Sequence, residues 1–232
     1  MLVVLACSMS VNAQIMRLLK NGKVVASYTS AQVDSIVFEQ EPKATGTAKA
    51  TINNNEVDVN WVQLWSGGPK FAEYNVGVTN GKAEGYGGYY CWGSSINKDP
   101  KRAFKTGNDA LTGTDDIATN LWGSNWRMPT KAELQALLDN CNVTWTNNYK
   151  RTGVKGKIYT GKGDYASHSL FIPATGALRQ GTVLLAGKAG LYWASTPNGT
   201  NNASTLYITE KYHKVNNTPR DMGCSVRAVL AE

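Results

Sequence analysis

Histidine and cysteine carry much of the catalytic and metal-binding chemistry of proteins, and this chain holds two His and four Cys in 232 residues. Neither His168 nor His213 has an Asp, a Cys or the other His at the spacing that a metal site needs. No Gly-x-Ser-x-Gly elbow frames a serine, and the sequence contains neither a Walker loop nor a dinucleotide-binding fingerprint. We therefore expect no catalytic residues and no cofactor. A Ser-His-Asp triad stays open as an alternative, because its members meet only in space.

The acidic and sulfur-bearing residues do not suggest a metal centre either. Asp115 and Asp116 are adjacent carboxylates without further spaced oxygens, which makes a poor calcium cage. Cys91, Cys141 and Cys224 follow the N-terminal segment, and none lies in a Cys-x-x-Cys pair. Three thiols allow at most one disulfide. We expect them to be small buried apolar residues, and we expect no metal site.

Residues 197–222 hold the side chains best suited to recognition. Asn, Thr, Tyr and charged residues alternate there around a few apolar ones. Tyr offers rigid contact area and Asn offers adaptable hydrogen bonds, although the same residues also occur in ordinary polar turns. The candidate ligand-binding residues are Asn198, Asn202, Tyr207, Glu210, Tyr212, His213, Asn217, Arg220 and Asp221.

The composition favours a turn-rich binding domain. Seven Trp and eleven Tyr stand against four Phe, and 23 Gly suit a loop-rich β fold. The net charge is +7, but the Lys and Arg residues are scattered and never form a run of four. Nucleic-acid-binding proteins cluster such residues, so we expect no nucleic-acid partner.

Two segments are expected to precede the main domain. Asn21-Gly22 joins two strand-like runs and predicts a β-hairpin within residues 14–40, followed by a short strand at 35–38. Residues 41–56 are rich in Ala, Thr, Asn and Lys and predict a linker before a domain at 57–232.

Within that domain the clearest element is a helix that begins at Thr130. Thr130 and Glu133 form a capping box. Leu134, Leu137, Leu138 and Cys141 follow with the spacing of one apolar helix face. A second helix is expected within 109–121, and short strands are expected at 206–208 and around Val215.

The first thirteen residues predict a signal peptide. They are apolar and uncharged, and Val11-Asn12-Ala13 fits the small-x-small rule for cleavage before Gln14. No Lys or Arg precedes the apolar run. Val4-Leu5-Ala6-Cys7 loosely resembles a bacterial lipobox, so a lipid anchor at Cys7 is the alternative to simple cleavage. Either route predicts a secreted or cell-surface protein.

Six blocks in order resemble the Fibrobacter succinogenes major paralogous domain family over roughly residues 57–230. They lie within 57–77, 88–93, 122–133, 171–176, 190–196 and 223–227, and include Gly88-Tyr89-Tyr90-Cys91-Trp92-Gly93 and Trp122-Gly123-Ser124-Asn125-Trp126-Arg127-Met128-Pro129. Cys91 stands where Ala is more usual. The family occurs in secreted and surface proteins of Bacteroidetes. The resemblance implies an α+β, C-type-lectin-like domain, loop-rich with short antiparallel strands and about two helices.

The blocks also have a plain structural interpretation. Trp92, Trp126, Trp145 and Trp193 are large anchors for a loop-rich domain. Arg127 and Arg227 are expected to tie loop carbonyls together, with an anion site as the alternative.

The fold is shared with formylglycine-generating enzymes, but Cys91 and Cys224 do not resemble their cysteine pair. The calcium loop of sugar-binding lectins is also missing. Residues 197–222 resemble the variable regions of retroelement-diversified proteins, whose randomised AAC codons cannot yield Glu210, Lys211, Lys214 or Met222. A fixed paralogue explains the chain as well.

The expected function is non-catalytic binding of a protein or glycan through residues 198–222 at the cell surface. One alternative is a structural or fimbria-associated subunit that attaches through the N-terminal hairpin. A formylglycine-generating type of enzyme is the other.

Overall fold

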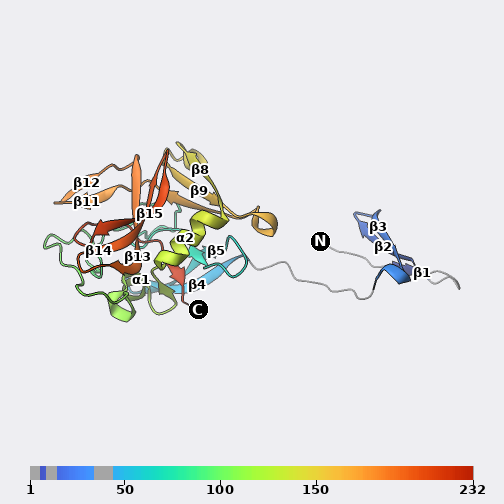
Figure 1. Ribbon diagram of the computed structural model, residues 1–232, viewed down its shortest axis with the longest axis horizontal. Helices are drawn as coiled ribbons and strands as arrows, with labels where there is room; N and C mark the ends of the chain where they lie inside the picture. The colour runs from blue at the N-terminus through green and yellow to red at the C-terminus, as the bar shows by residue number, and fades with distance from the viewer. Residues whose placement is uncertain (1–5, 9–14, 34–43, 232) are drawn as a thin grey trace. The chain divides into compact units, whose positions relative to one another are not determined.

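The computed structural model describes residues 6–8, 15–33 and 44–231 (Figure 1). They belong to two compact units, Met1–Glu41 and Pro42–Glu232. Most of the expected signal peptide, residues 1–5 and 9–13, and the strand expected at 35–38 lie outside the described residues. Within the described part of the chain, no helix is long and apolar enough to cross a membrane.

The first unit is an antiparallel sheet of β1 (Ala6–Ser8), β2 (Ile15–Lys20) and β3 (Lys23–Thr29), in that order. Asn21 and Gly22 join β2 to β3 with φ angles of 52° and 74°. Both lie in the left-handed region that a tight two-residue hairpin requires, and Asn and Gly adopt it most readily. The predicted hairpin is confirmed. A 3-10 turn, Ser30–Gln32, follows β3.

The second unit is mostly β, with two helices and several small antiparallel sheets. Its strands are β4 (Thr45–Ile52), β5 (Asn55–Val62), β6 (Phe71–Ala72), β7 (Trp126–Arg127), β8 (Asn142–Thr146), β9 (Gly156–Thr160), β10 (Ser169–Pro173), β11 (Ala177–Arg179), β12 (Thr182–Leu184), β13 (Ala189–Asn198), β14 (Asn202–Thr209), β15 (His213–Pro219) and β16 (Val229–Leu230). The helices are α1 (Ile117–Trp122) and α2 (Lys131–Asn140). Short 3-10 turns lie at Gly113–Asp115, Tyr149–Arg151 and Gly163–Tyr165.

The largest sheet has the order β4-β5-β6-β16-β7 and joins distant parts of the sequence. Val229 of β16 pairs with Phe71 on one side and with Arg127 on the other. Two three-stranded sheets, β10-β9-β8 and β13-β14-β15, and the β11-β12 hairpin complete the unit. The strands expected at 206–208 and Val215 are confirmed as parts of β14 and β15.

The predicted linker at 41–56 is wrong for its described residues. Residues 45–52 form β4 and pair along their whole length with β5. Asn53 and Asn54 make the turn with φ angles of 51° and 61°, which Asn tolerates better than other side chains. The small residues resembled a linker, but Ala50 packs into the core at 2% exposure.

The predicted helix at Thr130 is confirmed. The Thr130 hydroxyl accepts from the Glu133 amide at 3.2 Å, and the Glu133 carboxylate accepts from the Thr130 amide at 2.7 Å. Leu134 and Leu137 are buried on the face that the spacing predicted. The helix expected within 109–121 is the shorter α1, whose N-cap is Asp116.

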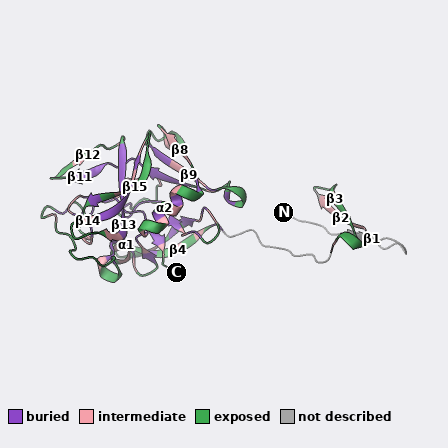
Figure 2. Cartoon of the chain, in the orientation of Figure 1, coloured by how far each residue is buried: buried purple, intermediate pink, exposed green. Residues whose placement is uncertain are grey.

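The core gathers aromatic side chains from distant segments, and Figure 2 shows most of β13 and β14 buried. Trp92, Trp126 and Trp193 are each 0% exposed, as expected of anchors. Trp145 is only half-buried on β8, an outer strand of its sheet, and its indole N–H donates to Asn147. The expectation that Trp145 is a core anchor is therefore wrong.

Arg127 and Arg227 bind loop carbonyls and a helix cap. The buried Arg227 donates to the carbonyls of Ala72 and Glu73 at 3.1 and 2.8 Å and to Asn75 Oδ1 at 2.9 Å. Burial lowers the pKa of Arg227 to about 10. Arg127 donates to both carboxylate oxygens of Glu133, at 2.8 and 2.6 Å, and to the Met128 carbonyl. Loop-tying is confirmed for Arg227.

Candidate ligand-binding site

The nine residues predicted from the sequence do not converge on one place. Asn198 pairs with Asn202 at one end of the β13-β14-β15 sheet. Glu210 and Tyr212 lie in the turn at the other end, where His213 pairs with Ile208. The eight residues of β14 separate these ends by roughly 23 Å, at about 3.3 Å per residue. A single small ligand cannot contact both.

The turn between β14 and β15 is the exposed end. Tyr212 is 64% exposed. The Glu210 carbonyl accepts from Lys157 Nζ at 3.1 Å. Burial, and then the charge of Lys157, lower the pKa of His213. Midway along the sheet, Tyr207 is half-buried against the core, while Asn217 is exposed on β15.

Arg220 was predicted to contact ligand, and that prediction is wrong. The residue is 0% exposed. Its guanidinium donates to the carbonyls of Asn202, Lys105 and Gly199 at 3.0, 2.7 and 2.7 Å. Those bonds are made inside the protein. Arg220 is therefore a structural residue, although it lies within the polar stretch 197–222.

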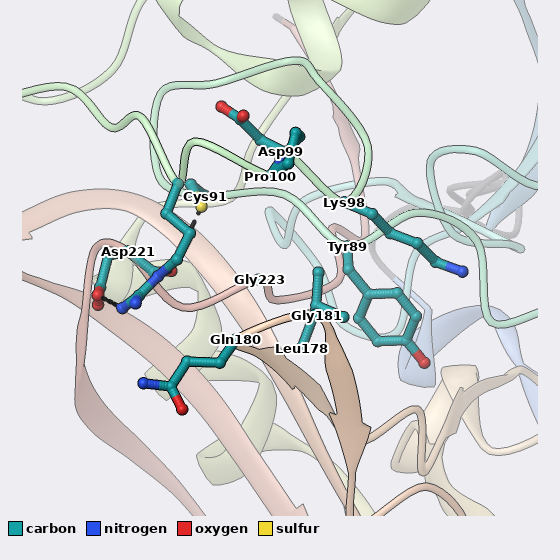
Figure 3. A pocket seen from close by; sticks show the side chains of 11 residues that line it. Tyr89, Cys91, Lys98, Asp99, Pro100, Leu178, Gln180, Gly181, Asp221 and Gly223 are labelled. Atoms are coloured by element: carbon teal, nitrogen blue, oxygen red, sulfur yellow. Dashed lines mark hydrogen bonds and ion pairs between the residues drawn. The ribbon is translucent and has the colours of Figure 1, made fainter.

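Of the predicted residues, Asp221 lines a cavity of about 360 Å³ in the described part of the chain. We call it the Asp221 pocket. Its lining comes from three segments far apart in the sequence: Tyr89, Cys91, Lys98, Asp99, Pro100, Arg102, Leu178, Gln180, Gly181, Asp221 and Gly223. Figure 3 shows Lys98 and Tyr89 on one side, with Asp221 and Gln180 on the other.

Local hydrogen bonds shape the first wall of the pocket, the loop from Tyr89 to Arg102. The Asp99 carboxylate is buried and accepts from the amides of Lys101 and Ala103 at 2.8 and 3.2 Å. The Lys98 amide donates to the Tyr89 carbonyl at 2.8 Å. Asp99 is therefore a turn-forming residue, and its oxygens are already engaged.

The second wall of the pocket is the β11-β12 hairpin, and the third wall is the segment 221–223. Backbone hydrogen bonds join these two walls. The amides and carbonyls of Leu178 and Gly223 bond reciprocally, at 2.7 and 2.9 Å. A Cβ on Gly223 would lie 2.7 Å from the Leu178 Cβ, so only glycine allows this approach. The β11-β12 hairpin and the 221–223 segment thus form one surface.

Three lining side chains sit on unusual backbone. Lys98, Arg102 and Gln180 have φ angles of 55°, 53° and 49°. Left-handed backbone is disfavoured for such residues, and it tends to persist where the surrounding structure holds a functional side chain in place. Gln180 owes its φ to the two-residue Gln180-Gly181 turn of the β11-β12 hairpin, whereas Lys98 and Arg102 lie in the loop of the first wall.

The charges of the lining differ in how far they are compensated. Arg102 forms an ion pair with Asp221, and each side chain is about one-third exposed, at 36% and 31%. Among the described residues, the Lys98 ammonium and the Gln180 carboxamide have no hydrogen-bond or ion-pair partner. The Tyr89 hydroxyl donates to the Thr175 carbonyl at 2.5 Å and keeps its acceptor capacity. Lys98 and Gln180 are thus available to a ligand.

The thiols at this site are poor nucleophiles. Cys91 lines the pocket and donates weakly to the Asp221 carbonyl at 3.4 Å, and Cys224 is fully buried. Both are free cysteines, as is Cys141. Burial raises the pKa of Cys91 to about 11, and it also raises the pKa of Cys224 well above its ordinary value. The thiolates that cysteine chemistry requires are therefore disfavoured here.

Other candidate groups serve the fold. Asp115 pairs with Lys105 at 2.8 Å, and Asp116 caps α1 through the amides of Ala118 and Thr119. The His168 ring lies 3.2 Å from the Ser167 hydroxyl and packs edge-on against Tyr165. Within the described ranges, no three His, Cys, Asp or Glu residues gather as metal ligands would.

The pocket was missed from the sequence because its walls come from three separated segments. Asn97-Lys98-Asp99-Pro100 is a turn signal that could have marked the first wall.

No protein-family model, curated protein or solved structure matches the chain.

Proposed function

We propose that the chain is an exported, non-catalytic binding protein with a C-type-lectin-like domain, which recognises a protein or glycan ligand through the Asp221 pocket. The pocket carries the proposal, because a cavity of about 360 Å³ offers uncompensated hydrogen-bonding side chains at the surface. Export is supported by the apolar segment 1–13. The proposed function is the one expected from the sequence. The proposed binding site is now the Asp221 pocket instead of the whole segment 198–222.

The family resemblance gains support from the way its blocks meet. Tyr90 and Cys224, from two blocks, exchange backbone hydrogen bonds at 3.0 Å. Tyr192, from a third block, bridges to Ser225, and the Trp193 indole donates to the Tyr90 carbonyl at 2.7 Å. Residues that resemble one family thus form one continuous core beneath the pocket. The C-type-lectin-like assignment is proposed on this basis.

The pocket favours binding over catalysis. A thiol-based mechanism is opposed by the raised pKa of Cys91. The free groups, Lys98 and Gln180, are hydrogen-bonding side chains in the lining of the cavity. Specific ligand sites are commonly built from a few such polar groups.

The test is a combined glycan and protein array probed with the chain starting at Gln14. We expect binding that is lost in a Lys98→Ala, Gln180→Ala double variant. Asn217→Ala, on exposed β15, is the matched control and is expected to bind like the parent. Binding that survives the double variant but is lost in Tyr212→Ala would place the site at the other end of the sheet and refute the pocket.

A second candidate is attachment to a partner through the N-terminal unit, as in a structural surface subunit. Val24, Val25 and Tyr28 of β3 are 51%, 61% and 38% exposed, which is unusual for large apolar residues in a small sheet. A Val24→Thr, Val25→Thr variant is expected to lose incorporation into a surface assembly and to keep array binding. If this variant also lost array binding, attachment through the N-terminal unit would not be a role separate from ligand binding.

A further inference from the structure

The N-terminal unit pairs a strand that export is expected to remove with a strand that is expected to remain. β1 lies within the apolar segment 1–13, and Figure 1 shows it beside β2. The register of this antiparallel pair is Ala6 with Arg17, Cys7 with Met16 and Ser8 with Ile15. The expected cut before Gln14 falls between the two strands. Export would therefore take away the strand that covers this edge of β2.

The cut would leave β2 with an open edge. The described part of the unit would then be the two-stranded β2-β3 hairpin and the turn that follows it. The backbone N–H and C=O groups that face β1 would lose their strand partner, and such an edge is a template for another chain. A two-stranded hairpin is only marginally stable in water, so a third strand would stabilise it. The edge of β2 is thus a strand-accepting site that β1 occupies before the cut.

The two faces of the hairpin specify the side chains that an incoming strand needs. Residues directly opposite each other in an antiparallel pair lie on the same face of the sheet. One face is apolar, because Met16 lies opposite Tyr28 and Leu18 is two residues further along β2. The other face carries the exposed Arg17, which lies opposite Ser27. A matching strand has an apolar residue opposite Met16 and a polar or charged one opposite Arg17.

The charge of the hairpin favours an acidic strand. Residues 15–33 include Arg17, Lys20 and Lys23 and no Asp or Glu. Arg17 forms no ion pair with the described residues, and Ala6, which lies opposite it in β1, brings no charge. A carboxylate at that position would add a cross-strand attraction. A second copy of the hairpin would bring only like charges. An anionic lipid surface would offer no backbone groups to pair with the edge.

We propose that removal of residues 1–13 opens the edge of β2 to an extended, acidic segment of a partner protein. The segment adds as an antiparallel strand in place of β1, with an Asp or Glu opposite Arg17 and an apolar residue opposite Met16. Backbone hydrogen bonds supply the affinity, and the alternating side chains supply the specificity. The proposal rests on the proposed export, and its surface is distinct from the Asp221 pocket.

The leader controls this site because it is part of the same chain. Before the cut, β1 is tethered to β2 by the six residues between them and competes at a high effective concentration. After the cut that competitor is gone. The edge therefore accepts its partner only in the exported form of the protein.

The test is an NMR titration of the chain starting at Gln14, followed at the amide resonances of residues 15–17. The probe is a blocked peptide, Ser-Thr-Val-Glu-Val-Thr-Ser, which in the register of β1 places Glu opposite Arg17 and Val opposite Met16. We expect it to bind at least about tenfold more tightly than to the full chain, in which β1 covers the edge. The same peptide with Lys in place of Glu is expected to bind at least about fivefold more weakly.

Two variants locate the charge contact. Arg17→Glu should reverse the preference, so that the Lys peptide binds more tightly than the Glu peptide. Lys23→Glu makes the same change at an exposed site on β3, and this matched control should keep the preference for Glu. In the full chain, Ala6→Glu should slow hydrogen exchange of the 15–17 amides relative to Ala6→Gln, because the carboxylate then lies opposite Arg17.

Several results would overturn the inference. Equal affinity of the Glu peptide for the two chains would refute control by the leader, and no binding to the shorter chain at about 5 mM would refute the site. Dimers of the shorter chain that the peptide dissociates would assign a second copy. Binding to phosphatidylglycerol vesicles without peptide binding would assign a lipid surface. An exported protein that begins at Cys7 would keep part of β1 and refute the opening.

The outcome is separate from that of the proposed binding function. The Lys98→Ala, Gln180→Ala variant, which is expected to lose array binding, should bind the Glu peptide like the parent. Array binding in a chain that ignores the peptide would refute the strand site and leave the Asp221 pocket standing. Peptide binding without array binding would do the reverse.

Discussion

The guanidinium of Arg220 lies over the indole ring of Trp92, with its central carbon 4.0 Å from the ring centroid. The same Arg220 bonds the carbonyls of Gly199 and Lys105. Trp92 in turn donates to the Ala194 carbonyl at 2.9 Å. The stacked pair therefore fixes the residue before Asp221 to the core, and so positions one wall of the pocket.

Replacing Arg220 with Ala should destabilise the domain. Three loop carbonyls would lose their donor and the buried Trp92 its stacking partner, so we expect a loss of about 3 kcal/mol in the free energy of unfolding. Urea denaturation measures it. Asn217→Ala, on an exposed site, should change the value by less than about 0.5 kcal/mol. A similar loss in both variants would contradict the structural role of Arg220.

Arg227 should be equally sensitive, and Lys should not replace it. A Lys ammonium cannot reach the Ala72 and Glu73 carbonyls and Asn75 in the planar geometry that the guanidinium provides. We expect Arg227→Lys to lower the free energy of unfolding by about 2 kcal/mol. Thermal denaturation followed by circular dichroism tests this. Full stability of the Lys variant would show that the carbonyls find other donors.

Removing the charge of Asp221 should affect binding more than folding. Its ion pair with Arg102 is partly exposed, so Asp221→Asn should change the free energy of unfolding by less than about 1 kcal/mol. Affinity for the pocket ligand should fall about tenfold, because an acceptor becomes a donor. Asp58→Asn, which breaks an exposed pair with Lys49, is the control and should leave affinity unchanged.

The buried thiols predict a loss of stability at alkaline pH. Burial raises the pKa of Cys91 and of Cys141 to about 11, from an ordinary value near 9. Between these values the unfolded chain releases protons that the folded chain keeps, so the free energy of unfolding falls as pH rises from 9 to 11. We expect urea titrations at pH 8, 9.5 and 10.5 to show the decline.

Two comparisons isolate the thiols in that experiment. A Cys91→Ala, Cys141→Ala variant should show a shallower decline, because only tyrosines and other groups then titrate. In the parent protein at pH 7.5, iodoacetamide should label these cysteines only after unfolding. Rapid labelling of the folded protein would contradict their burial.

Local patterns in the sequence predicted local structure well. The Thr130 capping box and the Asn21-Gly22 turn each depend on residues within four positions, and both occur as expected. The β4-β5 hairpin was missed because its Asn53-Asn54 turn lies among small polar residues that also suit a linker. A search for two adjacent Asn between pairing segments would have found it.

The site depended on contacts that no short pattern contains. Arg220 looks like a surface cation in a polar run, but Trp92 and the Lys105 carbonyl, both more than a hundred residues earlier, help to bury it. Asp221 was included in the candidate set, but Lys98 and Gln180 were not. They lie far from Asp221 in the sequence, and only the folded chain brings the three residues to one cavity.

The position of β16 between β6 and β7 has a consequence for synthesis. Val229 pairs with residues that leave the ribosome more than a hundred and fifty positions earlier in one case, and about a hundred positions earlier in the other. The central sheet therefore stays incomplete until the segment 223–230 has emerged. Such long-range pairing slows folding. The order β4-β5-β6-β16-β7 can therefore be completed only after nearly all of the unit Pro42–Glu232 has been synthesised.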